Sequence, residues 1–270
     1  MQKYYDYHTH SHISFDANIS IQQTCALALK RGACGLTFTE HAVFENDPAL
    51  DELPDIGAYE GELAVSRAAF PALELGMGLE LDLNPARLAD TEKLLKAAEW
   101  DFVLGSMHEL EGYNLSEYDC KFCIGKSDKQ AYHTYFSGLY ERVKACPSFD
   151  SLGHLDLLLR HHRFNDRPFD YADHAEILDA LLKLLIQRGQ GLEVNTAGPY
   201  YGAAEMHPGL TVLRRYRQLG GDIITCGSDC HSGPMVFRCI MEGYKMIKEA
   251  GFKYVSLFYN RELHQLKLEI

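Results

Sequence analysis

The chain opens with two histidines that are separated by a single residue, His8 and His10. Side chains of an extended strand alternate between its two faces, so both imidazoles point to the same side. Two imidazoles at one point form half of a metal site, provided that other segments bring further nitrogen or carboxylate ligands to it. A pair of surface histidines is the alternative interpretation, and the rest of the chain has to decide between the two.

Further residues that can bind metal ions recur where predicted strands end, namely Glu40, His41, Glu80, His108, His154, Asp229 and His231. In a barrel of parallel strands these ends share one face, so we expect a single cluster. An ionised carboxylate such as Glu80, within a buried strand, is costly unless it is paired or bound to metal. His154 alone could be a core histidine bonded to a backbone carbonyl. The agreement among six strands favours the metal interpretation.

The ligand types indicate which metals suit the cluster and how many. Imidazoles with a few carboxylates are typical of zinc, iron or manganese, whereas calcium and magnesium prefer oxygen ligands throughout. The candidates exceed what one ion can use. Glu80 is the best candidate for a bridging ligand, because a carboxylate has two oxygens that can hold two neighbouring ions.

Short apolar runs alternate with longer segments of helical periodicity, which is typical of parallel strands joined by helices. We predict strands at 4–10, 35–40, 73–81, 102–108, 151–156, 191–196 and 223–229, with a further candidate at 254–258. Helices are predicted at 20–31, 57–69, 85–98, 129–145, 171–188, 209–219 and 236–250. About seven βα units without a linker predict one domain over 1–270, a distorted barrel of seven or eight strands. The polar region 109–127 is expected to be a long loop over the functional face, either a lid or a plain surface loop.

Composition limits the class of partner and the compartment. A formal net charge of -12 argues against binding of long nucleic acid, which needs excess Lys and Arg. No apolar window is long enough to span a membrane and no signal peptide is evident, so we expect a cytoplasmic protein. Of the eight cysteines only Cys120 and Cys123 form a CxxC pair, which predicts reduced thiols rather than a zinc site. The sequence does not indicate an oligomeric state.

Six segments together resemble the polymerase-and-histidinol-phosphatase (PHP) superfamily: Asp6-Tyr7-His8-Thr9-His10, Thr39-Glu40-His41, Gly78-Leu79-Glu80, Gly105-Ser106-Met107-His108, Gly153-His154-Leu155-Asp156 and Gly227-Ser228-Asp229-Cys230-His231. The resemblance runs through nearly the whole chain, with the motifs in order. It implies a distorted (βα)7 TIM-like barrel with a centre of three divalent transition-metal ions.

The resemblance also implies a ligand set for each ion. One ion would be held by His8, His10, Glu80 and Asp229, a second by Glu80, His108 and His154, and a third by Asp16, His41 and His231. His41 and His231 would thereby also face the substrate. Asp16 could instead cap the helix that starts nearby. For Asp6 we expect a supporting role, in which it accepts a ring N–H of one of the histidines.

Within the superfamily, the segments 192–198 and 155–160 most resemble the histidinol-phosphate phosphatases of the PHP type. That resemblance implies that Arg160 binds the phosphate, which suits a guanidinium, although an ordinary surface arginine is the rival interpretation. The chain departs from the family pattern after Asn-Thr-Ala-Gly. Many relatives continue with a basic run, whereas this chain has Pro199-Tyr200-Tyr201-Gly202. His207 or Arg163 are candidates to supply the missing positive charge.

The expected function is that of a metal-dependent phosphomonoesterase that hydrolyses a small phosphorylated substrate, L-histidinol phosphate. Two ions sharing Glu80 would lower the pKa of a bridging water, and the resulting hydroxide would attack phosphorus in line. Asp229 would orient that hydroxide or take its proton, while Arg160 and the third ion would balance charge on the phosphoryl oxygens. Glu109 and Glu205 are candidates to contact a cationic amine of the substrate.

Three alternatives remain open. The same metal site could act on a nucleotide or another small phosphoester. The fold could belong to a non-catalytic metal-binding protein, which missing ligands would reveal, and none is missing. Metal-dependent amide hydrolysis usually involves a lysine bridge, where this chain offers Glu80.

Overall fold

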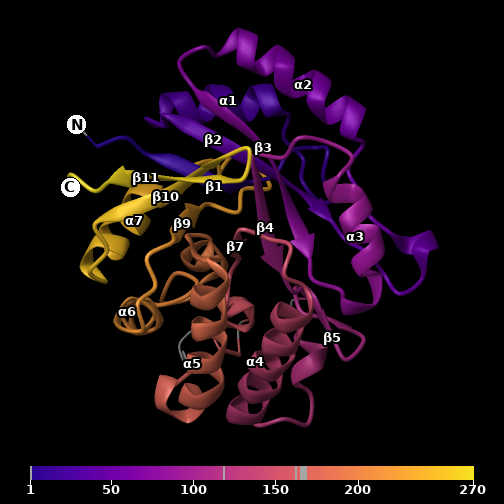
Figure 1. Ribbon diagram of the computed structural model, residues 1–270, viewed down its shortest axis with the longest axis vertical. Coiled ribbons are helices and arrows are strands. Elements are labelled where there is room, and N and C mark those ends of the chain that lie inside the picture. Colours follow the sequence, from indigo (N-terminus) through magenta and orange to yellow (C-terminus); the bar gives the residue numbers. More distant parts are fainter. Residues whose placement is uncertain (1, 118, 162, 165–168) are drawn as a thin grey trace.

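A computed structural model describes residues 2–117, 119–161, 163–164 and 169–270 of the chain. Seven parallel strands form one sheet in the order β1-β2-β3-β4-β7-β8-β9 (Figure 1). The sheet is nearly closed, because the amide of Asp229 donates to the carbonyl of His8 and a further bridge joins Thr9 to Cys230. The predicted (βα)7 barrel is therefore confirmed. Its strands are β1 (Tyr5–Thr9), β2 (Gly35–Ala42), β3 (Glu74–Asp82), β4 (Phe102–Ser106), β7 (Ser151–Leu152), β8 (Gly191–Asn195) and β9 (Ile224–Gly227).

Helices surround this sheet on the outside (Figure 1). They are α1 (Ile21–Lys30), α2 (Ile56–Ala69), α3 (Leu88–Leu95), α4 (Asp128–Ala145), α5 (Tyr171–Arg188), α6 (Leu210–Gln218) and α7 (Ile240–Glu249). Ser20 and Ser127 begin α1 and α4 with capping boxes, in which the serine hydroxyl accepts from the third amide of the helix. None of the helices in the described part of the chain is long and apolar enough to cross a membrane.

Register aligns the ends of neighbouring strands. His41 on β2 lies opposite Glu80 on β3, and Glu80 in turn lies opposite Leu104 on β4. β1, β2 and β4 are buried along their whole length, so the barrel interior is a packed core below this level. The residues that follow this buried layer are therefore presented together at the carboxyl ends of the strands.

The candidate eighth strand at 254–258 is not part of the barrel sheet. It forms β10 (Tyr254–Tyr259), which pairs antiparallel with β11 (Glu262–Lys267). The hydroxyl of Tyr7 donates to the carbonyl of Phe258, and these two residues belong to an apolar cluster with Phe102 and Leu104. The hairpin thus packs against side chains of β1 and β4 instead of adding a barrel strand.

Several predicted boundaries were wrong for local reasons. The strand at 151–156 ends at Leu152, after which the chain continues to the short helix η4 (Leu157–Arg160). The helix at 85–98 divides into η2 (Pro85–Arg87) and α3. The helix at 236–250 begins only at Ile240, because Phe237 and Cys239 have positive φ angles that are incompatible with a helix.

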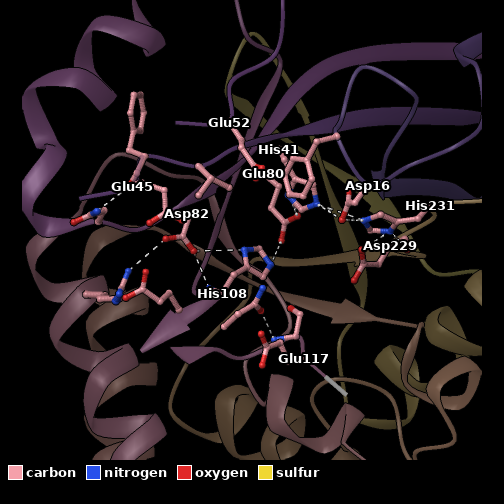
Figure 2. Close-up of a pocket in the computed structure, with 18 of the residues that line it drawn as sticks. Asp16, His41, Glu45, Glu52, Glu80, Asp82, His108, Glu117, Asp229 and His231 are labelled. Carbon is pink, nitrogen blue, oxygen red and sulfur yellow. Dashed lines mark hydrogen bonds and ion pairs between the residues drawn. The ribbon is translucent and has the colours of Figure 1, made fainter. Parts of the chain in front are cut away.

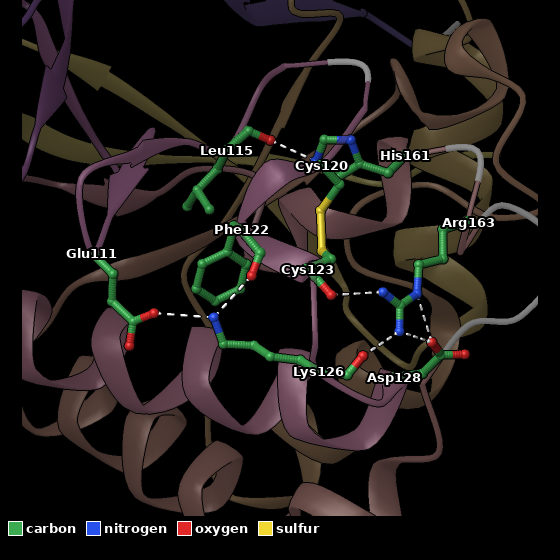
Figure 3. Close-up of a disulfide and its surroundings, with 9 residues drawn as sticks. All are labelled: Glu111, Leu115, Cys120, Phe122, Cys123, Lys126, Asp128, His161 and Arg163. Carbon is green, nitrogen blue, oxygen red and sulfur yellow. Dashed lines mark hydrogen bonds and ion pairs between the residues drawn. A yellow bond between two sulfur atoms is a disulfide. The ribbon is translucent and has the colours of Figure 1, made fainter.

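The region 109–127 contains a short hairpin, β5 (Glu109–Leu110) and β6 (Tyr113–Asn114), followed by η3 (Lys121–Cys123). Cys120 and Cys123 form a disulfide here, so the prediction of reduced thiols was wrong for this pair, although the other six cysteines are free (Figure 3). η3 brings the two cysteines together, with their Cα atoms 5.4 Å apart. His161 bonds the carbonyl of Leu115, and Arg163 donates to the carbonyl of Cys123 (Figure 3). The loop is therefore fastened to the segment that follows η4.

Candidate metal centre

All nine predicted metal ligands gather at the carboxyl ends of the strands, around a cavity of about 600 Å³. Six of them line the cavity, namely Asp16, His41, Glu80, His108, Asp229 and His231 (Figure 2). The other three, His8, His10 and His154, are buried. Asp16 contacts this cluster, and the cap of α1 is Ser20, so the capping alternative for Asp16 was wrong.

The first predicted ligand set forms a compact group of four atoms. Nε2 of His8 lies 3.1 Å from Nε2 of His10, 3.3 Å from Oε2 of Glu80 and 3.4 Å from Oδ1 of Asp229. Nε2 of His10 lies 3.4 Å from the same glutamate oxygen and 3.5 Å from the same aspartate oxygen. Zinc–nitrogen bonds of about 2.0–2.1 Å in a tetrahedron require ligand atoms about 3.3 Å apart. The two imidazole nitrogens therefore lie at ligand spacing from each other and from both carboxylate oxygens, and His8, His10 and Asp229 form a group whose ligand atoms all lie within 4.8 Å of one another.

The third predicted set shows the same spacing. Oδ2 of Asp16 lies 3.4 Å from Nε2 of His41 and 3.3 Å from Nε2 of His231. The two imidazole nitrogens are themselves 3.4 Å apart. These three atoms form one triangular face that an ion can occupy, and the half-exposed Asp16 leaves it open to the cavity.

The second predicted set meets at the other oxygen of Glu80. Oε1 of Glu80 lies 2.7 Å from Nε2 of His154 and 3.3 Å from Nε2 of His108. Oε2 faces His8 and His10, as described above. The two oxygens of this single carboxylate thus face two separate groups of imidazoles, which is the arrangement a bridging ligand needs.

Hydrogen bonds to the outer ring nitrogens test whether the first group fits a cation. Nδ1 of His8 lies 2.6 Å from a carboxylate oxygen of Glu193, which can only accept, so this nitrogen carries the proton. Nδ1 of His10 lies 3.3 Å from Oγ of Ser14, whose own proton goes to Glu40. In neutral rings both Nε2 atoms then present lone pairs to each other across 3.1 Å. A shared cation between them removes this repulsion, so the donor set fits a metal ion.

Burial and charge define the electrostatics of the cluster. Burial would raise the pKa of Glu80, but the charges of His8, His108 and His41 hold it well below its usual range. Oε2 of this buried carboxylate accepts no hydrogen bond from the described residues. Burial lowers the pKa of His10 to about 4, with a contribution from its neighbours His231 and His41. The cluster thus places anionic carboxylate oxygens among imidazole nitrogens, which is the donor combination that transition metals bind.

Glu193 on β8 is a supporting residue that the sequence interpretation missed. One of its oxygens accepts from the ring of His8, and the other accepts from the amide of His154 at 2.8 Å and from Asn195 at 3.2 Å. Asp6 does not have the role expected for it, because it accepts from the backbone amides of His8 and Ser228 and not from a ring nitrogen. Like Glu80, Glu193 is a carboxylate within a buried strand, Gly-Leu-Glu-Val-Asn, where a charged side chain is rare unless it is paired. The argument applied to Glu80 could therefore have identified Glu193 from the sequence.

Arg160 lies at the cavity, beside the cluster. Its guanidinium contacts Oδ2 of Asp229 and lies under the ring of Tyr201, with 4.9 Å from Cζ to the ring centroid. His207 is fully buried and bonded to Asp156, and neither it nor Arg163 is among the residues that line the cavity. The basic run that the resemblance leads one to expect is therefore replaced by an aromatic ring, and neither expected substitute reaches the cavity.

The two glutamates proposed for a substrate amine have different positions. Glu109 lines the cavity together with Glu45, Glu52 and Glu117. Glu205 does not line it, and its carboxylate lies close to Gly209 instead. In Figure 2, Glu45 and Asp82 lie on the opposite side of Glu80 and His108 from Asp16 and His231. We call Glu45, Glu52, Glu109 and Glu117 the acidic wall.

The fold and the site together define the class of the protein as a seven-stranded α/β barrel whose strand ends carry groups that could hold metal ions. Residues 6–197 match the PHP domain family, and the chain belongs to this family. A Lactococcus lactis protein named histidinol-phosphatase is 28% identical over 98% of this chain and 98% of its own length. A Lactococcus lactis crystal structure of histidinol phosphate phosphatase, complexed with zinc, L-histidinol and phosphate, superimposes with a TM-score of 0.87 at 26% identity over 98% of this chain and 100% of its own. A Listeria monocytogenes structure shares the fold, with a TM-score of 0.76 at 19% identity over 88% of this chain and 99% of its own.

Replacing Glu193 should weaken metal binding without removing a ligand. In Glu193→Gln an amide nitrogen must face either His8 or the two donors from His154 and Asn195, so one support is lost. We expect roughly a 10- to 100-fold loss of zinc affinity, measured by competition with a chromophoric chelator. Glu74→Gln is the control, since Glu74 bonds Tyr5 and Tyr259 away from the cluster. Equal zinc affinity in the Glu193 variant and the control would contradict the supporting role.

Proposed function

We propose that this protein is a metal-dependent phosphomonoesterase that hydrolyses L-histidinol phosphate to histidinol and phosphate. The observation that carries the proposal is the position of Glu80, whose two oxygens face separate imidazole groups beside a cavity that contains an arginine. The bound zinc, L-histidinol and phosphate named for the Lactococcus lactis structure support the same substrate. The matching length of the Lactococcus relative supports a single domain over residues 1–270.

Three divalent ions are proposed, with zinc, iron or manganese as candidates. His8, His10, Glu80 and Asp229 would hold one, Glu80, His108 and His154 a second, and Asp16, His41 and His231 a third. When bound, such ions supply a nucleophile at neutral pH by acidifying a coordinated water, and they neutralise charge on the phosphoryl oxygens. The spacings of 3.1 to 3.5 Å in the first set and 3.3 to 3.4 Å in the third support these assignments.

Arg160 and Asp229 are proposed to act on the phosphoryl group. A guanidinium has five N–H donors, and in Arg160 Nε is buried with no hydrogen-bond partner among the described residues. The charge of Asp229 raises the pKa of Arg160 against the effect of burial, so the side chain remains a cation. It can therefore bind phosphoryl oxygens and stabilise the charge that develops on them. His41 and His231, which line the same cavity, face the same group.

The two carboxylate oxygens of Asp229 contact different partners. Oδ1 faces His8 and His10, whereas Oδ2 contacts Arg160 and accepts from Asn195 at 3.1 Å. Burial opposes ionisation, but Arg160 and His8 hold the pKa of Asp229 well below its usual range. The residue is thus an anion at neutral pH, suited to orient a nucleophile. A low pKa makes it a weak proton acceptor, so we assign it orientation in preference to proton transfer.

The acidic wall supports a cationic substrate. Burial raises the pKa of Glu45, and the charges of Glu109 and Asp82 raise it further. Negative charge is therefore concentrated in this part of the cavity. Histidinol phosphate carries a protonated amine on the carbon next to the one that bears its phosphate, and this amine would offset that charge. A nucleotide brings no such cation, so the acidic wall disfavours it as the substrate. A purely structural metal site would not need an open cavity lined by an arginine whose Nε has no hydrogen-bond partner among the described residues.

A panel of phosphomonoesters tests the proposal. The metal-loaded protein should hydrolyse histidinol phosphate with a kcat/KM at least roughly a hundredfold above that for a nucleoside monophosphate, as set by differential binding of the amine. A preference for the nucleotide would overturn the substrate assignment.

Glu80→Gln tests the centre by itself. A neutral amide cannot bridge two cations, so we expect loss of at least one ion per chain by elemental analysis and a fall of kcat by roughly three orders of magnitude or more. Unchanged metal content together with unchanged kcat would exclude Glu80 as the bridge.

Glu109→Gln tests the contact with the amine. Loss of one charge from the acidic wall should raise KM for histidinol phosphate by roughly tenfold, and should leave KM for p-nitrophenyl phosphate, which has no cation, unchanged. Glu111→Gln is the matched control, because Glu111 belongs to the same hairpin turn but pairs with Lys126 and does not line the cavity. A parallel rise of KM for both esters would contradict an amine contact.

A further inference from the structure

Tyr201 contacts the arginine that is proposed to bind phosphate. Its ring lies over the guanidinium of Arg160, whose side chain is only 14% exposed. Burial raises the pKa of Tyr201 to about 12, so the ring stays a neutral phenol with an electron-rich face. A guanidinium at 4.9 Å from the centroid of such a ring is within the range of a cation–π interaction.

The turn that carries Tyr201 is tied to the candidate metal centre through Asn195. The side-chain oxygen of Asn195 accepts from the amide of Ala197 at 3.0 Å, at the start of the short helix η5 (Gly198–Tyr201). Its side-chain nitrogen donates to Oδ2 of Asp229, the oxygen that Arg160 contacts. One buried side chain therefore fixes both the turn that presents Tyr201 and the carboxylate that pairs with Arg160.

Glycines on both sides of this turn restrict its backbone conformation. A Cβ at Gly198 would lie 2.2 Å from the carbonyl oxygen of Glu205, so only glycine fits there. Gly202 has a φ of 85°, a conformation that L side chains rarely adopt. The backbone thus holds the ring of Tyr201 in one place at the cavity.

We propose that Tyr201 is a positioning residue that holds the guanidinium of Arg160 at the cavity, where it can donate to the phosphoryl group. The proposal rests on the proposed function, and adds to it that phosphate affinity depends on an aromatic face. Without the ring of Tyr201, Asp229 would be the remaining described partner of the guanidinium. The side chain of Arg160 would then shift toward the carboxylate of Asp229. Tyr201 acts through Arg160 and needs no contact with the phosphate itself.

Inorganic phosphate, titrated calorimetrically into the metal-loaded protein, is the direct probe. Tyr201→Leu keeps an apolar side chain but removes the aromatic face, and should weaken phosphate binding roughly five- to tenfold. Tyr201→Phe and Tyr201→Trp keep the face and should bind within about twofold of the parent protein. Tyr254→Leu is the matched control, because Tyr254 is similarly exposed but lies on β10 and does not line the cavity.

Tyr201→Leu should also raise KM for histidinol phosphate more than it lowers kcat, because the guanidinium is displaced and not removed. In an Arg160→Ala background, Tyr201→Leu should have no further effect on phosphate affinity, since its partner is gone. Equal phosphate affinity for the Leu and Phe variants, or an undiminished effect of Leu without Arg160, would overturn the proposal. Phosphate binding that follows this pattern in a protein that does not hydrolyse histidinol phosphate would leave the positioning role intact and reject the proposed function.

Discussion

The structure depends on one carboxylate, that of Glu80, which is 1% exposed near the carboxyl end of β3 in the parallel sheet. An isolated charge at such a position would cost several kcal/mol or more in free energy. Five imidazoles surround it at distances of 2.7 to 3.4 Å from its oxygens, those of His8, His10, His41, His108 and His154. The strands that deliver these histidines are therefore constrained in register, because a shift of one residue would point each side chain to the other face.

A second layer of polar residues holds this arrangement. Glu193 and Asn195, two residues apart on β8, point to the same side and reach His8 and Asp229 respectively. Gly227 on the neighbouring strand leaves the space, since a Cβ there would lie 2.6 Å from Glu193 and 2.2 Å from Cβ of His8. Asn195 also fixes the turn of Tyr201, so the support of the candidate metal centre and of the proposed phosphate-binding arginine is shared. A substitution in β8 is consequently expected to affect metal and phosphate affinity together.

The sequence allowed the barrel and the grouping of its histidines to be predicted, because both follow from short-range periodicity. The spacing of His8 and His10 and the isolated Glu80 in an apolar run are visible in a few residues. The candidate strand at 254–258 is indeed a strand, but its place outside the barrel could not be predicted, because such a run has the same pattern in a barrel and in a hairpin. Glu193 could have been recognised by the argument applied to Glu80, whereas the different role of Asp6 depends on backbone geometry. The disulfide and the stacking of Tyr201 on Arg160 depend on loop conformation, which local patterns do not determine.

Glu80 is proposed to bridge two ions within a centre of three. Anomalous diffraction from a crystal of the purified, metal-loaded protein, recorded on both sides of the zinc, iron and manganese edges, tests it most directly. Three peaks per chain are expected: one among His8, His10 and Asp229, one beside His108 and His154, and one among Asp16, His41 and His231. The first two should lie a few ångströms apart on either side of Glu80. A single peak, or two peaks with Glu80 bound to neither or only one, would contradict the claim.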